Sequence, residues 1–105
     1  MTSDNERFYD DIIAPRLHQL AEECKQRGMS FVANVEYDPG DTASTILLTE
    51  NSGYHARLMC AAAESGGNID SLIFAIMKYA RENGHGSICL QQLGVPSVAE
   101  TETRQ

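Results

Sequence analysis

The chain has 105 residues, of which 42% are hydrophobic and 22% charged, and its formal net charge is −7. This length leaves little room for a second hydrophobic core and the composition is too apolar for a disordered chain, so one folded domain is predicted. The shortage of Lys and Arg disfavours nucleic acid and an anionic membrane as partners, because both are bound mainly through cations. No apolar run reaches the roughly 18–20 residues of a membrane span, so we expect no membrane attachment and a cytoplasmic location.

The N-terminal region has the pattern of an amphipathic helix. Ser3 followed by Glu6 forms a capping box that predicts a helix beginning near residue 4. Its apolar stripe ends before Gly28, which is suited to a helix C-terminus. Pro15 lacks an N–H, so it should kink the helix or split it into a short leading turn and a main piece starting at Pro15. The stripe consists of Phe8, Ile12, Ile13, Leu17, Leu20, Ala21 and Cys24.

A β-hairpin is expected next. From residue 29 to residue 37 apolar and polar side chains alternate, which predicts a half-buried strand. Asp38-Pro39-Gly40-Asp41 has the residue types of a tight turn, and residues 42–49 form a second β-rich run.

Two helices are expected after the hairpin. Residues 54–65 alternate like a strand, but they contain an alanine-rich run with high helix propensity; both readings stay open and helix is favoured. Asn68 is a good N-cap for a helix ending near Asn83. Its apolar stripe places Ile73 and Ile76 in the core.

The last expected element is a closing strand over residues 87–93. The order of elements is then α-β-β-α-α-β, an α+β fold with a small antiparallel sheet of about three strands covered on one face by two or three helices. Residues 1–94 should form a single globular domain, and residues 95–105 a flexible polar C-terminal tail.

Four residues are candidates for catalysis: His55, His85, Cys60 and Cys89. A nucleophilic cysteine needs a neighbour that stabilises its thiolate, and the two histidines are the available bases. Nothing in the spacing pairs a histidine with a cysteine, and Cys60 and Cys89 stand among apolar residues. We therefore expect reduced thiols that fill the core, and a non-enzymatic role is favoured over an enzymatic one.

His18 and Glu22 are candidates for a metal site. They lie four residues apart on the first expected helix, so their side chains reach a common point, and Cys24 could supply a third ligand. No CxxC or HExxH cluster supports them. Neither a metal nor any other cofactor is therefore expected.

The function expected from these patterns is that of a small non-enzymatic cytosolic binding or regulatory protein that acts through protein–protein contacts. One alternative is a small enzyme or ligand-binding domain with a His- and Cys-containing pocket between subunits. Another is an acidic mimic of nucleic acid that inhibits a basic protein. A homodimer is expected in addition, because a three-stranded sheet exposes edges that a second copy can pair.

Overall fold

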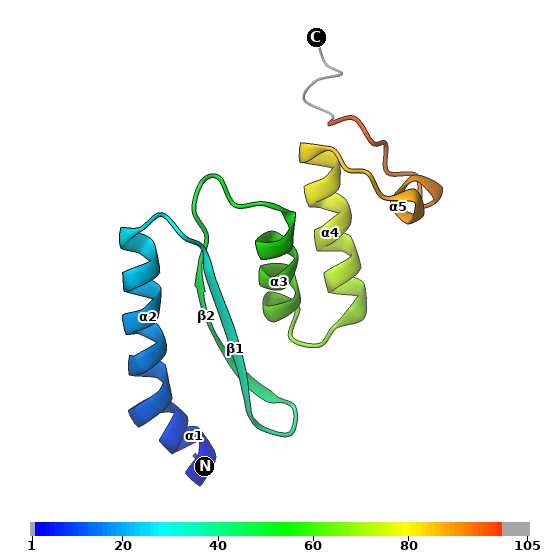
Figure 1. Cartoon of the computed structure of the whole chain (residues 1–105). Helices are drawn as coiled ribbons and strands as arrows, with labels where there is room; N and C mark the ends of the chain where they lie inside the picture. Colours follow the sequence, from blue (N-terminus) through cyan, green and yellow to red (C-terminus); the bar gives the residue numbers. More distant parts are fainter. Residues whose placement is uncertain (1, 100–105) are drawn as a thin grey trace. The chain divides into compact units, whose positions relative to one another are not determined.

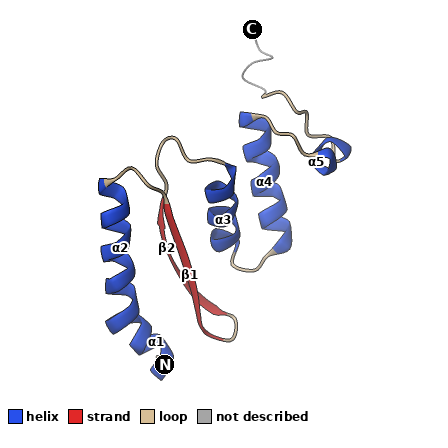
Figure 2. Ribbon diagram, viewed as in Figure 1, coloured by secondary structure: helices blue, strands red, loops and turns tan. Residues whose placement is uncertain are grey.

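The computed structural model describes residues 2–99. The chain divides between Gly66 and Gly67 into two compact units. The first unit contains an N-terminal helical segment, a two-stranded antiparallel hairpin and one further helix, and the second contains two helices (Figures 1 and 2). The protein is therefore a small α+β fold, as the sequence predicts, while the single domain expected over residues 1–94 remains a prediction.

The N-terminal segment is helical throughout and changes its winding before Pro15. The Ser3 Oγ accepts a hydrogen bond from the Glu6 N–H at 3.0 Å, so the predicted cap is formed. The Ala14 N–H bonds to the Tyr9 carbonyl, five residues back, which makes one π-helical turn before the proline. The predicted split is confirmed, and the main piece begins one residue earlier than expected. The pieces are α1 (Asp4–Phe8), the π-helical turn η1 (Tyr9–Ile13) and α2 (Ala14–Gln26).

The predicted hairpin is confirmed. It consists of β1 (Phe31–Asp38) and β2 (Asp41–Leu47), with Pro39 and Gly40 at the turn. β1 begins two residues later than expected because the Met29 N–H bonds back to the Cys24 carbonyl at 2.9 Å and completes the end of α2.

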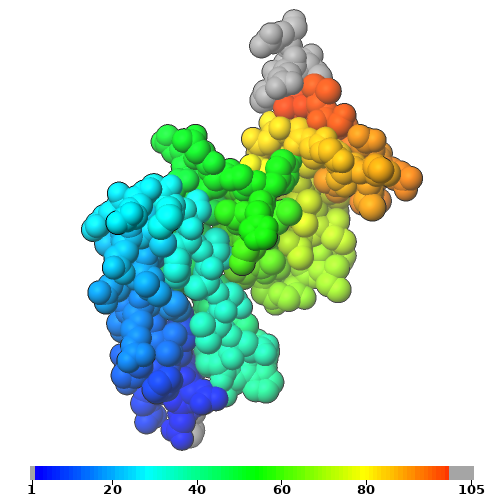
Figure 3. Space-filling view, viewed as in Figure 1, coloured from blue at the N-terminus to red at the C-terminus, as the bar shows by residue number. Residues whose placement is uncertain are grey.

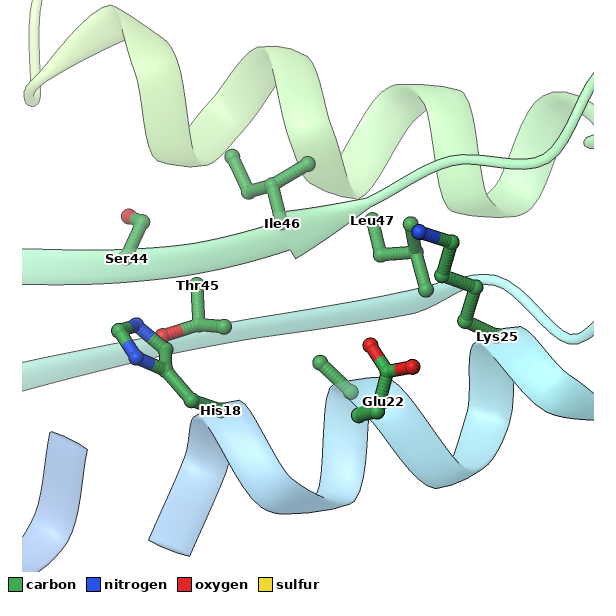
Figure 4. A pocket seen from close by; sticks show the side chains of 8 residues that line it. His18, Glu22, Lys25, Ser44, Thr45, Ile46 and Leu47 are labelled. Atoms are coloured by element: carbon green, nitrogen blue, oxygen red, sulfur yellow. The ribbon is translucent and has the colours of Figure 1, made fainter. Parts of the chain in front are cut away.

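Helices lie on both faces of the hairpin, whereas the sequence predicted helices on one face only. In Figure 1, α2 and α3 (Tyr54–Ser65) flank the hairpin from opposite sides. Thr45 and Leu47 point toward α2, and Ile46 points away from it (Figure 4). Ile46 pairs across the hairpin with Val32, and both side chains are half-buried. This apolar pair lies on the face away from α2 and needs a second helix to cover it. The alternating pattern of the first strand does not predict that helix, because it marks only the other face as apolar.

Hydroxyl groups hold the loop that connects β2 to α3. The Ser30 Oγ lies 2.6 Å from the Ser52 Oγ and accepts a hydrogen bond from the Thr49 N–H at 3.1 Å. The Ser52 Oγ in turn donates to the Thr49 carbonyl at 2.7 Å. The loop is thereby tied to the start of the hairpin, and residues 54–65 emerge from it as a helix, the favoured of the two readings.

The second unit begins with α4 (Ile69–Asn83). The Asn68 side chain accepts a hydrogen bond from the Ser71 N–H at 2.9 Å, which confirms the expected N-cap. The expected core position of Ile73 is wrong, since this side chain is 41% exposed. The apolar stripe of α4 did not place Ile73 correctly, because apolar residues occupy more than one face of this helix.

Residues 87–93 form a helix and not the predicted closing strand. The helix is α5 (Ile88–Gln92), and the Ser87 Oγ caps it by accepting from the Leu90 N–H at 3.1 Å. Gly94 follows at φ +89°, and the amides beyond the helix return to carbonyls of its last turn. A serine cap and a glycine C-terminus so close together stabilise one short helix, and the described residues offer no free neighbouring strand in this unit.

Part of the expected C-terminal tail packs against the end of α4. Val95 is fully buried, and the His85 N–H donates to the Ser97 carbonyl at 3.0 Å. A Cβ added to Gly84 would approach the same carbonyl at 3.0 Å, so the close passage of the chain favours glycine there. Residues 100–105 of the expected tail lie outside the described residues.

The buried Val95 provides a test of this packing. We expect Val95→Ala to lower the free energy of unfolding by about 1.5–3 kcal/mol, because it removes two buried methyl groups and leaves a cavity. Val98, which is 50% exposed, is the matched control, and Val98→Ala should change stability by less than about 0.5 kcal/mol. Urea unfolding followed by circular dichroism measures both variants. Equal losses would contradict the packing of residue 95.

Candidate functional site

The first unit contains an open groove of about 360 Å³ between α2 and β2 (Figure 4). In the space-filling view the helical segment, in blue and cyan, lies directly against the hairpin (Figure 3). The groove therefore has one wall from a helix and one from a strand. Its lining residues are His18, Ala21, Glu22, Lys25, Ser44, Thr45, Ile46 and Leu47.

The helical wall follows from residue spacing. The four α2 residues that line the groove stand at positions i, i+3, i+4 and i+7, which share one face of a helix. Ala21 is the smallest of them and leaves space near the middle of the wall. His18, Glu22 and Lys25 provide polar groups along it. This wall can therefore contact an apolar and a polar part of the same ligand.

The strand wall is formed by the outer edge of β2. In an antiparallel pair, every second residue directs its N–H and C=O away from the partner strand. Among residues 2–99, β2 pairs only with β1, so these outward groups have no strand partner. Four consecutive residues of β2 line the groove, so the strand borders it along this stretch.

Thr45 is the most informative residue of the groove. Its side chain is only 9% exposed, and among residues 2–99 its Oγ1 has no hydrogen-bond partner. Figure 4 shows this hydroxyl pointing toward the helical wall, where His18 lies. A buried hydroxyl without a partner destabilises a protein by about 1–3 kcal/mol. The hydroxyl is enclosed between β2 and α2, so this cost is part of the packing of the hairpin under the helix.

The two metal candidates, His18 and Glu22, line this same groove. Cys24, the suggested third ligand, does not line it. Among residues 2–99 the structure forms no group of three or more His, Cys, Asp and Glu side chains suited to a metal ion. The groove thus brings together two of the three suggested ligands.

Cys60 is buried in α3, and its neighbours keep its thiol protonated. The Sγ donates a hydrogen bond to the Glu64 Oε1 at 3.4 Å. Burial, this hydrogen bond and the negative charge of Glu64 raise the pKa of the Cys60 thiol, while Arg57 lowers it by less. No hydrogen bond joins Cys60 to His55, which is exposed five residues earlier on α3. These surroundings oppose the formation of a nucleophilic thiolate.

His85 joins three parts of the second unit. Its Nδ1 accepts a hydrogen bond from the Ser87 N–H at 2.9 Å, and its Nε2 lies 3.0 Å from the Val95 carbonyl oxygen. Since a carbonyl only accepts, the Nε2 carries the proton, and both ring nitrogens are occupied. Cys89 is exposed, which corrects its expected place in the core, and it forms no hydrogen bond with His85.

Four carboxylates act electrostatically on Tyr37 in β1. Its ring stacks on that of Tyr9, with centroids 5.9 Å apart. Burial raises the pKa of the Tyr37 hydroxyl, and the charges of four carboxylates add to this effect. These belong, in order of decreasing effect, to Glu6, Asp41, Asp10 and Asp38.

Within residues 2–99, none of the helices has the length and apolar character needed to cross a membrane. Comparison with known proteins gave no match, whether to family models, to curated sequences or to solved structures. The groove and its chemistry are therefore the basis for a functional proposal.

The surroundings of the cysteines predict their order of reaction with iodoacetamide. We expect Cys60 in the folded protein to be alkylated at least about tenfold more slowly than Cys89, because burial and a raised pKa leave less accessible thiolate at a given pH. Mass spectrometry of peptides from a time course measures both rates. In denaturant the two rates should converge. Faster reaction of Cys60 in the folded state would contradict the environment described here.

The contacts of His85 predict a structural role. We expect His85→Ala to lower the free energy of unfolding by about 1–3 kcal/mol, because the Ser87 N–H and the Val95 carbonyl both lose a partner. His55 is exposed and serves as the control; His55→Ala should change stability by less than about 0.5 kcal/mol. Urea unfolding compares them, and a His85 variant as stable as the wild type would exclude this role.

Proposed function

We propose that this protein is a small non-enzymatic cytosolic binding protein that acts through protein contacts, and that it takes up an extended polypeptide segment in the groove between α2 and β2. The observation that carries the proposal is the unpaired outer edge of β2, which lines the groove along four consecutive residues. An extended segment can add to such an edge through main-chain hydrogen bonds.

The helical wall supports a polypeptide ligand over a small molecule. A strand placed along β2 runs beside α2, where Ala21 leaves room for its side chains. Glu22 and Lys25, one turn apart, offer opposite charges to that segment. In strand addition, main-chain pairing supplies affinity and the contacts of alternate side chains supply specificity. The groove has both components.

The negative charge of the chain also affects which kind of segment can bind in the groove. The first unit carries most of the acidic side chains, so its electrostatic field favours the approach of a neutral or basic segment. A protein that regulates a partner by binding one of its segments needs no catalytic residue. The protonated Cys60 thiol and the hydrogen-bonded ring of His85 agree with such a role.

Selection from a library of displayed random peptides tests the proposal, with the full chain as bait at nanomolar concentration. We expect peptides to be enriched whose binding is weakened about tenfold or more by Glu22→Lys, because this change reverses a charge in the groove wall. Glu23→Lys is the matched control, since Glu23 is also exposed on α2 but does not line the groove. It alters net charge equally and should leave binding unchanged. No enrichment, or equal effects of the two substitutions, would refute the proposed function.

A further inference from the structure

One side of α4, in the second unit, exposes large apolar side chains. Ala80 is fully buried, whereas Phe74 lies about 120° away from it around the helix axis and is 67% exposed. Ile73, the neighbour of Phe74, is exposed as well. Exposed apolar side chains that gather on one side of an element are typical of a surface that binds another protein.

This side of α4 carries a stripe with an acidic and a basic end. The stripe has the spacing i, i+4, i+7 and i+11, which stays on one side of a helix, and it consists of Asp70, Phe74, Met77 and Arg81. Asp70 is exposed, and Met77 and Arg81 are half-buried. Each charge suits the dipole at its own end of the helix, but the dipole does not require the charges to lie in line with Phe74 and Met77.

The stripe is complementary to a reversed copy of itself. When two identical helices pack antiparallel about a two-fold axis, residue i faces residue j of the second copy, and j faces i. With the axis between residues 75 and 76, Phe74 faces Met77 of the second copy, and Asp70 faces Arg81 of the second copy. A parallel pair would instead place like charges together at both ends of the contact.

We propose that this stripe is an interface at which α4 packs antiparallel against α4 of a second copy of the chain. The charges identify the occupant, because a helix with the reverse order of charges complements the stripe, and α4 in the antiparallel direction has that order. The inference concerns the second unit alone, so it goes beyond the proposed function and does not depend on the groove.

The apolar and the charged contacts have different roles in this interface. Packed helices have axes about 8–10 Å apart, a gap that the Phe74 ring and the Met77 thioether can fill from both sides. Contacts between a thioether and an aromatic ring are favourable, and burial of both side chains supplies most of the affinity. The ion pairs of Asp70 and Arg81 lie at the two ends, near solvent, where they set the direction and the register more than the affinity.

Exchange of the two charges tests the interface by sedimentation equilibrium of the full chain. The wild type should form a dimer below roughly 100 μM, a modest affinity because a single helix pair is a small interface. Asp70→Arg and Arg81→Asp each place like charges opposite one another and should weaken the dimer about tenfold or more. The double variant restores opposite charges and should dimerise within about threefold of the wild type. Both changes oppose the helix dipole, so a more stable helix cannot explain the restoration.

Glu82→Arg is the matched control, because Glu82 is exposed on α4 outside the stripe and this change alters the net charge as Asp70→Arg does. Circular dichroism shows whether each variant keeps its helices, and either folded single variant suffices for the comparison. A wild type that stays monomeric, equal effects of Asp70→Arg and Glu82→Arg, or a double variant as weak as the single ones would each overturn the inference. Peptide selection through Glu22 tests the proposed function separately from all of these results.

Discussion

The structure of the first unit depends on the pairing of β1 with β2. A two-stranded sheet is marginally stable in water unless another element covers it. Here α2 covers one face and α3 the other, and side-chain contacts tie both ends of the hairpin to its surroundings. Asn5 donates a hydrogen bond to the Tyr37 carbonyl at 2.9 Å near the turn, and Ser30 connects the opposite end to the loop before α3. The groove exists because these contacts fix α2 beside the outer edge of β2, which pairs with no third strand within the described part of the chain.

Signals contained within a few neighbouring residues predicted most of the elements. Ser3 and Asn68 cap helices as expected, and the turn closed by Asp38 and Asp41 produces the hairpin. The prediction failed at residues 87–93, where alternation and helix capping coexist in one short segment. Alternation stabilises a strand only if another strand is available to pair with it, whereas the Ser87 cap needs nothing beyond the segment itself. Local hydrogen bonds therefore made this segment a helix.

The site could be predicted only in part, for the same reason. Helical spacing brought His18 and Glu22 to one face of α2, and both line the groove. It could not identify Thr45, which is distinguished by its burial beneath α2 and by a hydroxyl that has no partner among residues 2–99. Both properties arise from packing between segments far apart in the sequence. The exposure of Ile73 is a similar case, because periodicity identifies an apolar face without showing what covers it.

The distribution of charge affects how the outer edge of β2 can meet other chains. An uncharged strand edge pairs with any other extended chain, and proteins that expose one tend to aggregate. In this chain the uncharged segment 42–48 follows acidic residues at the hairpin turn. The net charge of −7 repels copies of the chain that approach each other through their acidic surfaces. This repulsion acts over about one Debye length, roughly 8 Å at physiological salt, so it is strongest for poorly aligned encounters that bring acidic surfaces together. A segment added to the β2 edge, as proposed above, would form main-chain hydrogen bonds away from those surfaces. The acidic composition, which indicates no ligand by itself, therefore opposes contacts that bring the acidic surfaces of two copies together.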